Sequence, residues 1–293
     1  MSDLDYFTKY LMDLKRADIE QDFDSDVFAY YGPIGTWALK PFRTALEAMT
    51  KNDEQRKERI AIILHTGGGE VEAVERMVEM IRRWYPEVYF IVPQIAMSAG
   101  TIFCMSGDKI FMDYTSALGP IDPQVQEKGG NFVPALGYLD KFNDILEKSK
   151  HDELSPVEFA IAQNQDMALL RRYEQARDLS VNLLKQWLVM YKFKDWAMHR
   201  SPGPKHGAKV TTAEKEERAQ AIAAQLGDNH TWHSHGRMIG IGTLTKALRL
   251  EVDDYTDQVE RRKKINSYHD VMIDYMRQKQ MTVLLHARHT LGV

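Results

Sequence analysis

Residues 60–70 read Ile-Ala-Ile-Ile-Leu-His-Thr-Gly-Gly-Gly-Glu, an uninterrupted apolar run that leads into three consecutive glycines. Such a run is typical of a strand that is buried on both faces of a parallel sheet. Apolar residues then return at helical spacing, at Val71, Val74, Val78 and Ile81, and this spacing predicts a helix. The segment therefore predicts a strand, a glycine-rich turn and a helix, which is the repeating unit of an α/β fold.

The same order of elements recurs on both sides of this segment. Short apolar runs predict further strands at residues 27–31, 88–92 and 109–112. Helical spacing predicts helices at residues 3–20, 37–49, 214–226 and 243–250, a helix that opens at Ser98, and a mostly helical stretch over residues 135–198. Strands that alternate with helices through residues 27–115 predict a parallel sheet with right-handed crossovers.

The composition narrows the class of protein. The chain has 293 residues, 44% of them hydrophobic, and 38 Lys and Arg against 42 Asp and Glu give a formal net charge of −4. These values are typical of a globular protein and give no reason to expect nucleic acid as a partner. A single cysteine, Cys104, argues against a disulfide framework and fits a reducing compartment.

The sequence also bears on membranes. The first 23 residues carry charges throughout and lack the apolar segment of a signal peptide. No apolar run reaches the roughly 18 residues that a membrane span needs. We therefore expect a cytoplasmic protein with no membrane span.

The glycine-rich turn, His65-Thr-Gly-Gly-Gly-Glu70, is the first candidate for chemistry. Glycines permit backbone conformations that are closed to other residues, and their N–H groups beside a helix N-terminus can stabilise a developing negative charge. The alternative is a tight turn with no chemical role. A phosphate-binding loop is excluded because the Gly-Lys-Ser/Thr ending is missing.

The second candidate is Ser98, in Pro93-Gln-Ile-Ala-Met-Ser-Ala-Gly-Thr101. A serine between a buried strand and a helix presents its hydroxyl at the sheet edge, next to a free backbone N–H. The small residues Ala96, Ala99 and Gly100 leave space for a substrate carbonyl. From these residues alone, an ordinary N-cap is the other explanation for this serine.

The third candidate is Asp122, in Ser116-Ala-Leu-Gly-Pro-Ile-Asp-Pro-Gln124. Two prolines and a glycine restrict the shape of this loop, and Asp122 is its only formal charge. A carboxylate held there could orient a protonated base. It could equally cap backbone N–H groups within a turn.

The motifs LHTGGG, VPQIAMSAGT and SALGPIDPQV, in this order and spacing, resemble the serine dehydrogenase proteinase family. That family belongs to the Clp-fold serine proteinases, related to the Clp protease proteolytic subunit and to signal peptide peptidase A. The resemblance covers residues 25–150 and, more weakly, residues 230–253. It implies a Clp/crotonase-like α/β core of parallel-sheet ββα units with helical extensions. It also implies a serine endopeptidase that needs no cofactor, acts on polypeptides and forms homo-oligomers.

The resemblance assigns roles to single residues. Ser98 matches the nucleophile of the family. Gly68 matches the glycine whose N–H forms half of the oxyanion hole, and Ala99 would supply the other N–H. Gly69 follows Gly68 in the same bend and is included as a candidate oxyanion-hole residue. The sequence departs from the family at Gly67, where relatives usually carry proline.

The general base does not carry over directly. Asp122 stands where the Clp subunit has its histidine. Lys141 lies at a spacing that fits the lysine base of signal peptide peptidase A, but a helix-face lysine in solvent is the other explanation. His235 resembles a histidine of the serine dehydrogenase proteinase family, although Gly236 replaces the aspartate that usually follows. We rank Ser98–His235, with Asp122 as the orienting group, above Ser98–Lys141, because imidazole needs no large pKa shift to accept a proton at neutral pH.

Two metal motifs are weak. His230, His233 and His235 could converge only on an irregular loop, and no cysteine completes a zinc signature. Asp22, Asp24 and Asp26 mimic the start of a calcium loop, but Val27 occupies the position that requires glycine. We therefore expect no bound metal.

The predicted organisation has five parts and leaves two alternative functions open. The alternatives are a catalytically inactive Clp-fold protein that binds peptides, and a crotonase-type acyl-CoA enzyme that shares the fold and the oxyanion hole. The parts are an N-terminal helix (1–24), a catalytic core (25–150), a helical extension and linker (151–210), a closing segment of the core (211–256) and a C-terminal helical tail (257–293).

Overall fold

The computed structural model describes residues 3–50, 56–122, 124–126, 132–200 and 203–292. Within these residues the main sheet has seven strands in the order β11-β10-β1-β2-β3-β5-β9, of which the last five run parallel. The strands are β1 (Asp26–Tyr31), β2 (Arg59–His65), β3 (Glu87–Val92), β5 (Lys109–Met112), β9 (Asp253–Asp254), β10 (Leu284–Ala287) and β11 (Thr290–Gly292).

Apolar side chains fill both faces of the sheet. In β2, Ile60, Ile62 and Leu64 join the core on one face, whereas Ala61 and Ile63 join the core on the other. The continuous apolar run thus forms a strand without a solvent face, as predicted. The predicted fold class, a mostly parallel α/β core with helical extensions, is confirmed.

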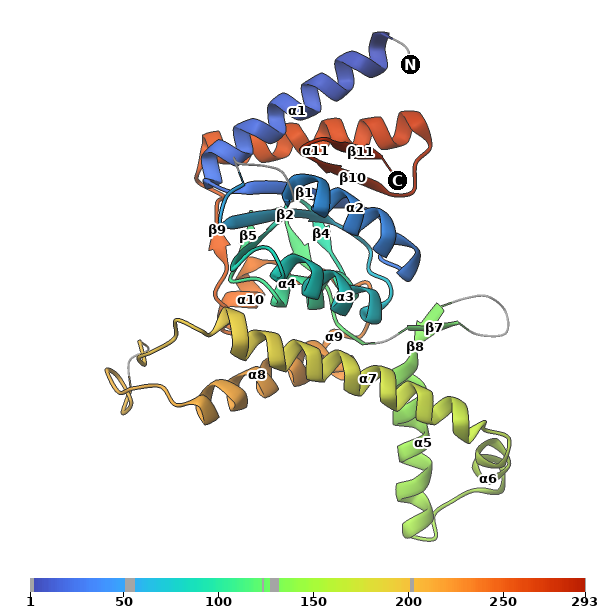
Figure 1. The fold of residues 1–293 in the computed structure, drawn as a ribbon. Helices are drawn as coiled ribbons and strands as arrows, with labels where there is room; N and C mark the ends of the chain where they lie inside the picture. The colour runs from blue at the N-terminus through green and yellow to red at the C-terminus, as the bar shows by residue number, and fades with distance from the viewer. Residues whose placement is uncertain (1–2, 51–55, 123, 127–131, 201–202, 293) are drawn as a thin grey trace.

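Helices cover each face of the sheet (Figure 1). One face carries α1 (Asp3–Phe23) and α11 (Val259–Lys279), which pack against each other. The other face carries the short 3-10 turn η1 (Thr36–Ala38), α2 (Leu39–Thr50), α3 (Val71–Arg82), α4 (Ala99–Met105), α7 (Met167–Trp187) and α8 (Thr212–Leu226).

The C-terminal segment is more than a helical tail. Helix α11 ends at Gln280, which adopts a left-handed conformation with φ +53°, and the chain then turns back into β10 and β11. Strand β10 pairs antiparallel with β1, and all four of its residues are buried. The sequence prediction missed these strands because the periodicity of a four-residue apolar run does not distinguish a strand from a helix.

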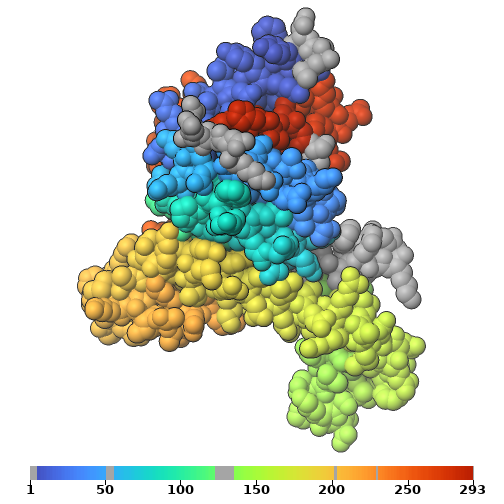
Figure 2. Space-filling view, in the orientation of Figure 1, coloured from blue at the N-terminus to red at the C-terminus, as the bar shows by residue number. Residues whose placement is uncertain are grey.

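Residues 135–173 form a projection that we call the arm (Figures 1 and 2). The arm has a small core of its own, made by Leu136, Leu139, Leu170 and Tyr173 with Ala135. It comprises α5 (Ala135–Lys150), α6 (Pro156–Gln163) and the start of α7, and it follows the hairpin β7 (Gln124–Gln126) and β8 (Phe132–Pro134). Helix α5 therefore lies outside the layers of the sheet, although the sequence prediction placed it within the core.

Helix α7 leads from the arm back to the sheet, where it passes into the π-helical turn η2 (Leu188–Lys192). In the predicted linker, residues 201–202 lie outside the described residues. The His199 N–H donates to the Ala208 carbonyl oxygen, and the His199 carbonyl oxygen accepts from the Gly207 N–H. After α8 come the short helices α9 (Asn229–Trp232) and α10 (Ile241–Lys246). Among the described residues, no helix combines the length and the apolar character that crossing a bilayer requires.

Candidate active site

Ser98 lies between β3 and α4, after the two-residue strand β4 (Ile95–Ala96). Its backbone has φ +53° and ψ −119°, a conformation that residues with a side chain rarely adopt. Ser98 stands at the N-cap of α4, but its hydroxyl makes no capping hydrogen bond. The N-cap explanation therefore does not account for this serine, and its partly buried hydroxyl is available for another role.

The glycine bend lies against Ser98. Gly68 has φ +113°, and a Cβ atom placed on it would lie 2.8 Å from Ser98 Cβ and 3.3 Å from Ser98 Oγ. Gly69 has φ +148°, and its Cβ would clash with the Ile34 carbonyl oxygen at 1.9 Å. Both positions therefore require glycine, and the bend brings its main chain into contact with the serine.

The N–H groups around Ser98 differ in their partners. The Gly68 N–H donates to Thr66 Oγ1 at 3.0 Å. Among the described residues, no hydrogen bond engages the N–H of Gly69 or that of Ala99, the first residue of α4. The Ala99 N–H is one of the donors that a helix start leaves without an acceptor. Two of the three predicted oxyanion donors are thus free of protein acceptors, whereas the third already has one.

Asp122 and His235 form a hydrogen-bonded pair although 113 residues separate them in sequence. His235 Nδ1 lies 2.8 Å from Asp122 Oδ1, the Asp122 side chain is 3% exposed, and that of His235 is 17% exposed. Because a carboxylate can only accept, Nδ1 donates the proton and Nε2 keeps its lone pair. The pair thus leaves His235 Nε2 able to accept a proton.

Backbone and threonine contacts bring the Asp122 loop to the serine. Thr101 Oγ1 accepts from the Gly119 N–H at 2.9 Å and lies 2.9 Å from the Ala96 carbonyl oxygen, to which it can donate. A Cβ on Gly119 would lie 2.5 Å from Met97 Cε. The loop therefore packs directly beside the residue that precedes Ser98.

A second set of contacts brings the His235 segment to the same place. Leu118, in the short strand β6 (Ala117–Leu118), forms an antiparallel bridge with Ile239, through hydrogen bonds of 3.1 and 2.8 Å. Ile121 N–H donates to the carbonyl of Leu226 at the end of α8. Three segments that are distant in sequence thus meet at one edge of the sheet.

No hydrogen bond joins Ser98 to His235 or to Lys141 in the part of the chain that the structure describes. Lys141 is exposed on α5, and its neighbour Asp140 pairs with His230 at 3.6 Å. The arm therefore touches the histidine loop, but Lys141 itself projects into solvent.

The three histidines do not converge on a common point. His230 is 82% exposed and faces Asp140, while His235 faces Asp122. His233 is exposed and has φ +61°. The described residues contain no group of three or more His, Cys, Asp or Glu placed to hold a metal ion.

Sequence reasoning did not assign roles to the threonines that organise the site. Thr66 holds the glycine bend, and Thr101 ties the Asp122 loop to α4. Both threonines stand inside the motifs that carry the family resemblance, and this position could have indicated a role in the site. Their role depends on contacts across 2 and 18 residues that spacing alone does not reveal.

A family model described as ClpP-like SDH-type serine proteinase matches residues 44–203. The chain belongs to this family. The match includes the glycine bend, Ser98 and Asp122, whereas His235 lies beyond it. The resemblance predicted from the three motifs is confirmed.

Two uncharacterized proteins of Methanocaldococcus jannaschii are similar to this chain in sequence. One is 42% identical over 66 residues, which cover 22% of this chain and 23% of the relative. The other is 30% identical over 101 residues, which cover 34% of this chain and 33% of the relative. The matched segments thus span a third or less of these relatives.

Solved structures also resemble this SDH-type chain. One is the 1510-N membrane-bound stomatin-specific protease, as a mutant in complex with a substrate peptide, with 24% identity over 40% of this chain and 56% of that chain and a TM-score of 0.33. Another is a mutant of ClpP1 from Listeria monocytogenes, with 20% identity over 58% of this chain and 91% of that chain and a TM-score of 0.30.

Proposed function

We propose that this chain is a serine endopeptidase that hydrolyses polypeptides with Ser98 as its nucleophile. The observation that carries the proposal is the position of Ser98: a strained turn between strand and helix, a hydroxyl without a capping role, and contact with the Gly68 bend. A serine on such a turn has its Oγ exposed to a substrate and a free N–H directly after it. The family of the chain supports the same chemistry.

In the proposed reaction, Ser98 Oγ attacks the peptide carbonyl carbon and its proton passes to His235 Nε2. The C–N bond then breaks, and the leaving amine takes this proton from His235. Water resolves the acyl-enzyme by the same route in reverse. Asp122 accepts a hydrogen bond from the His235 Nδ1–H throughout and stabilises the imidazolium, while the proton stays on Nδ1.

The proposed step requires Ser98 and His235 to come into hydrogen-bond contact when substrate binds. Such contacts are often long or poorly aligned in ligand-free enzymes and tighten in the complex. The bridge between Leu118 and Ile239 supports this, because it fixes the histidine segment beside the loop that packs on Met97.

We assign the oxyanion hole to the Ala99 N–H together with the glycine bend. Ala99 follows the nucleophile, and its N–H has no acceptor among the described residues. In the bend, the Gly69 N–H also has no acceptor among the described residues. The Gly68 N–H already donates to Thr66 Oγ1, so it would have to donate to the oxyanion and to this hydroxyl at once. Each such donor typically contributes about 10²–10³ to the rate.

His235 is the proposed base in preference to Lys141. A lysine base must be buried to lose its proton at neutral pH, but Lys141 is exposed on the arm. His235 is mostly buried and paired with a carboxylate. We therefore expect His235→Ala to abolish activity and Lys141→Ala to retain it.

The experiment that tests the nucleophile is covalent labelling with a fluorophosphonate. Wild type should be labelled on Ser98, Ser98→Ala should not be labelled, and Ser234→Ala should react like wild type. Ser234 is a matched control because it is exposed in the same loop as His235. Equal labelling of wild type and Ser98→Ala would refute the proposal.

A catalytically inactive, peptide-binding protein is the second candidate. It is favoured by the lack of a Ser98–His235 hydrogen bond among the described residues and by the engaged Gly68 N–H. A chain that binds unfolded polypeptide, shows no turnover and remains unlabelled would fit this candidate.

We also propose that the protein forms homo-oligomers. Helix α1 exposes a group of large apolar side chains on the face away from α11. Its members are Tyr6, Phe7, Tyr10, Leu11 and Leu14. The arm exposes a second group, and large exposed apolar groups of this kind commonly mark contact surfaces between proteins.

A further inference from the structure

Thr66 is a buried residue at which the glycine bend, the segment before Ser98 and α4 meet; it is 1% exposed. Its N–H donates to the Ile95 carbonyl oxygen, and its carbonyl oxygen accepts from the Met97 N–H, each at 3.0 Å. Its Cγ2 methyl group lies against Gly100, where an added Cβ would approach it to 2.4 Å. The segment that carries Ser98 therefore holds Thr66 through both its backbone and its side chain.

The Thr66 hydroxyl bonds to the backbone of Gly68. Its oxygen accepts from the Gly68 N–H at 3.0 Å and lies 3.4 Å from the Gly68 carbonyl oxygen, to which it can donate. The family resemblance assigns this Gly68 N–H to the oxyanion hole. In the resting protein the N–H is thus directed at a side-chain hydroxyl and not at a substrate oxygen.

The part of the bend that can move is a single peptide unit. Thr66 is fixed, because its side chain is β-branched and buried. The Gly68 carbonyl oxygen is also fixed, since it accepts from the Ile34 N–H at 2.9 Å. Between these anchors, the peptide unit from Gly67 to Gly68 joins two residues without side chains, and a Cβ on Gly67 would meet no atom within 4 Å. Because glycines permit a wide range of dihedral angles, this unit can rotate and turn the Gly68 N–H toward a bound substrate.

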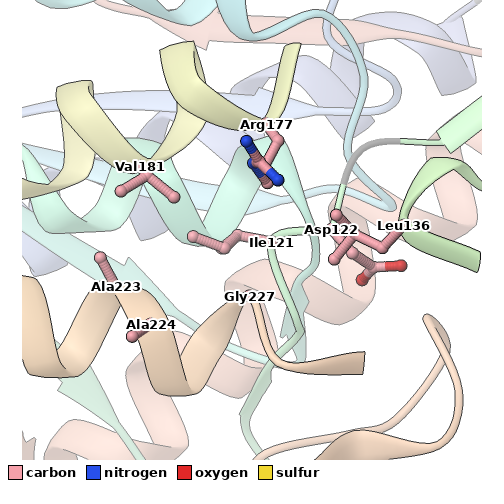
Figure 3. Close-up of a pocket in the computed structure, with 8 residues that line it drawn as sticks. All are labelled: Ile121, Asp122, Leu136, Arg177, Val181, Ala223, Ala224 and Gly227. Carbon is pink, nitrogen blue, oxygen red and sulfur yellow. The ribbon is translucent and has the colours of Figure 1, made fainter. Parts of the chain in front are cut away.

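The base side of the site rests on other segments. The loop that carries Asp122 borders a cavity of about 140 Å³ together with α5, α7 and α8 (Figure 3), and in the described part of the chain its lining includes no residue of the glycine bend. The hydroxyl that accepts from this loop belongs to Thr101 and not to Thr66. A change confined to the Thr66 hydroxyl should therefore act on the oxyanion hole and leave the Asp122–His235 pair in place.

We propose that Thr66 is a positioning residue whose hydroxyl withholds the Gly68 N–H from the oxyanion hole until the reaction begins. This inference rests on the proposed peptidase function. A negative charge forms on the attacked carbonyl oxygen, and hydrogen bonds to a charged acceptor are about twice as strong as those between neutral groups. The oxyanion therefore takes the N–H from the neutral hydroxyl as the peptide unit rotates. Because breaking the contact with Thr66 costs free energy, the hydroxyl slows the reaction, while it gives a buried N–H an acceptor in the resting protein.

Thr66→Val tests this inference, because it removes the hydroxyl and nearly keeps the shape of the side chain. A fluorophosphonate places its phosphoryl oxygen in the oxyanion hole, so Ser98 should be labelled about 3–10-fold faster than in wild type, the factor to which the net strength of one hydrogen bond corresponds. The gain should lie in the limiting rate constant kinact and not in the inhibitor constant KI, since the new hydrogen bond forms in the transition state. The thermal transition should fall, because the Gly68 N–H loses its acceptor. Loss of packing alone would not make a less stable protein react faster.

The pH dependence of labelling separates the oxyanion hole from the base. His235 must be neutral to accept the proton of Ser98, so its titration sets the pH at which labelling is half-maximal. Thr66→Val should keep this pH and raise the rate on both sides of it. A shifted pH would show that the substitution acts through His235, and this inference would be wrong.

Three further variants complete the test. Thr66→Ser keeps the hydroxyl and loses only the methyl group against Gly100, so it should be less stable than wild type but be labelled within twofold of the wild-type rate. Thr50→Val removes the hydroxyl of another buried threonine, which donates to the Leu46 carbonyl oxygen within α2, and it should be labelled at the wild-type rate. Thr66→Ala also removes the acceptor and takes the place of Thr66→Val if the valine variant does not fold.

The outcomes separate this inference from the proposed function. Slower labelling of Thr66→Val than of wild type would show that the hydroxyl holds the bend in its reactive form, and an equal rate would show that the Gly68 N–H does not reach the oxyanion. Either result overturns the role of Thr66, whereas the peptidase function stands as long as wild type is labelled on Ser98. If neither wild type nor Thr66→Val is labelled, the proposed function fails and this inference fails with it.

Discussion

Ser98 holds a backbone conformation that costs free energy. Non-glycine residues with such dihedral angles typically store about 1–3 kcal/mol of strain, and φ +53° with ψ −119° falls in this class. The surrounding structure enforces the angles, because Met97 N–H bonds to the Thr66 carbonyl and Gly100 N–H to the Met97 carbonyl. A glycine would relieve the strain, so the retention of a hydroxyl here supports a chemical role for Ser98.

The hydrogen bond between Asp122 and His235 predicts how a single substitution, Asp122→Asn, changes the reactivity of Ser98. In Asp122→Asn, the amide can donate to Nδ1 and so stabilises the tautomer in which Nε2 carries the proton. His235 could then no longer accept the Ser98 proton, and the rate of fluorophosphonate labelling should fall by about 10²–10⁴. The second-order labelling rate constant measures this effect.

Asp140→Asn is the matched control for this prediction. Asp140 also pairs with a histidine, His230, but on the exposed face of α5. It should label at the wild-type rate. A labelling rate for Asp122→Asn within twofold of wild type, with an unchanged thermal transition, would exclude Asp122 as the orienting group.

At the scale of elements, the face of the sheet that α1 and α11 cover carries two histidines, one partly buried and one buried, that the proposed reaction does not use. His65 ends β2 and His269 lies on α11, with their rings 5.0 Å apart. Tyr31 OH lies 3.0 Å from His269 Nδ1, whereas His65 Nδ1 is buried without a partner among the described residues. Burial lowers the pKa of His269 to about 4, and burial together with the charge of His269 lowers the pKa of His65 to about 4.

These pKa values predict a loss of stability in mild acid. The pKa of histidine in the unfolded chain is about 6.5, so the unfolded state binds protons first as the pH falls. The stabilisation is fully present above pH 6.5 and is lost as the pH falls toward 4. Between pH 7 and pH 5, each histidine should lower the free energy of unfolding by on the order of 2 kcal/mol.

Urea denaturation at pH 7 and pH 5 measures this loss. His65→Phe removes one of the titrating groups and should reduce the loss between the two pH values by on the order of 2 kcal/mol. His151→Phe, at an exposed histidine of the arm, should leave it unchanged. A His65→Phe protein with the full wild-type loss would show that His65 is not buried in its neutral form.

At the scale of the whole molecule, the sequence predicted the parts of the fold that local pattern controls. Strand β2 and helix α3 follow directly from apolar spacing, and the glycine bend between them follows from residue type. Strand β10 was missed because its four-residue apolar run is locally ambiguous, and the partner that makes it a strand, β1, lies more than 250 residues earlier in the chain. Local spacing also could not place Asp122 and His235 near each other, because the Leu118–Ile239 bridge that joins their segments is a contact across the fold. Only the family resemblance predicted that both residues act with Ser98.

The arm exposes large apolar side chains that no contact within the chain buries. Helix α6 has a complete capping box, formed by Ser155 and Glu158, yet none of its residues is buried. Its apolar side chains Val157, Phe159 and Ile161 are 69%, 53% and 45% exposed. An apolar helix that buries nothing within its own chain is expected to be covered by another subunit.

This reasoning predicts that Phe159→Asp weakens self-association without unfolding the chain. Removing an exposed side chain creates no cavity, whereas a carboxylate in a contact between subunits would lose its hydration. Wild type should sediment as an oligomer at micromolar concentration, and Phe159→Asp should shift toward the monomer. Gln163→Asp adds the same charge at an exposed polar position of α6 and should sediment like wild type. A wild-type protein that is monomeric under these conditions would rule out the proposed oligomer. An equally large oligomer in Phe159→Asp would show that the interface between subunits does not include α6. The exposed side chains of α1 would then be the next surface to mutate.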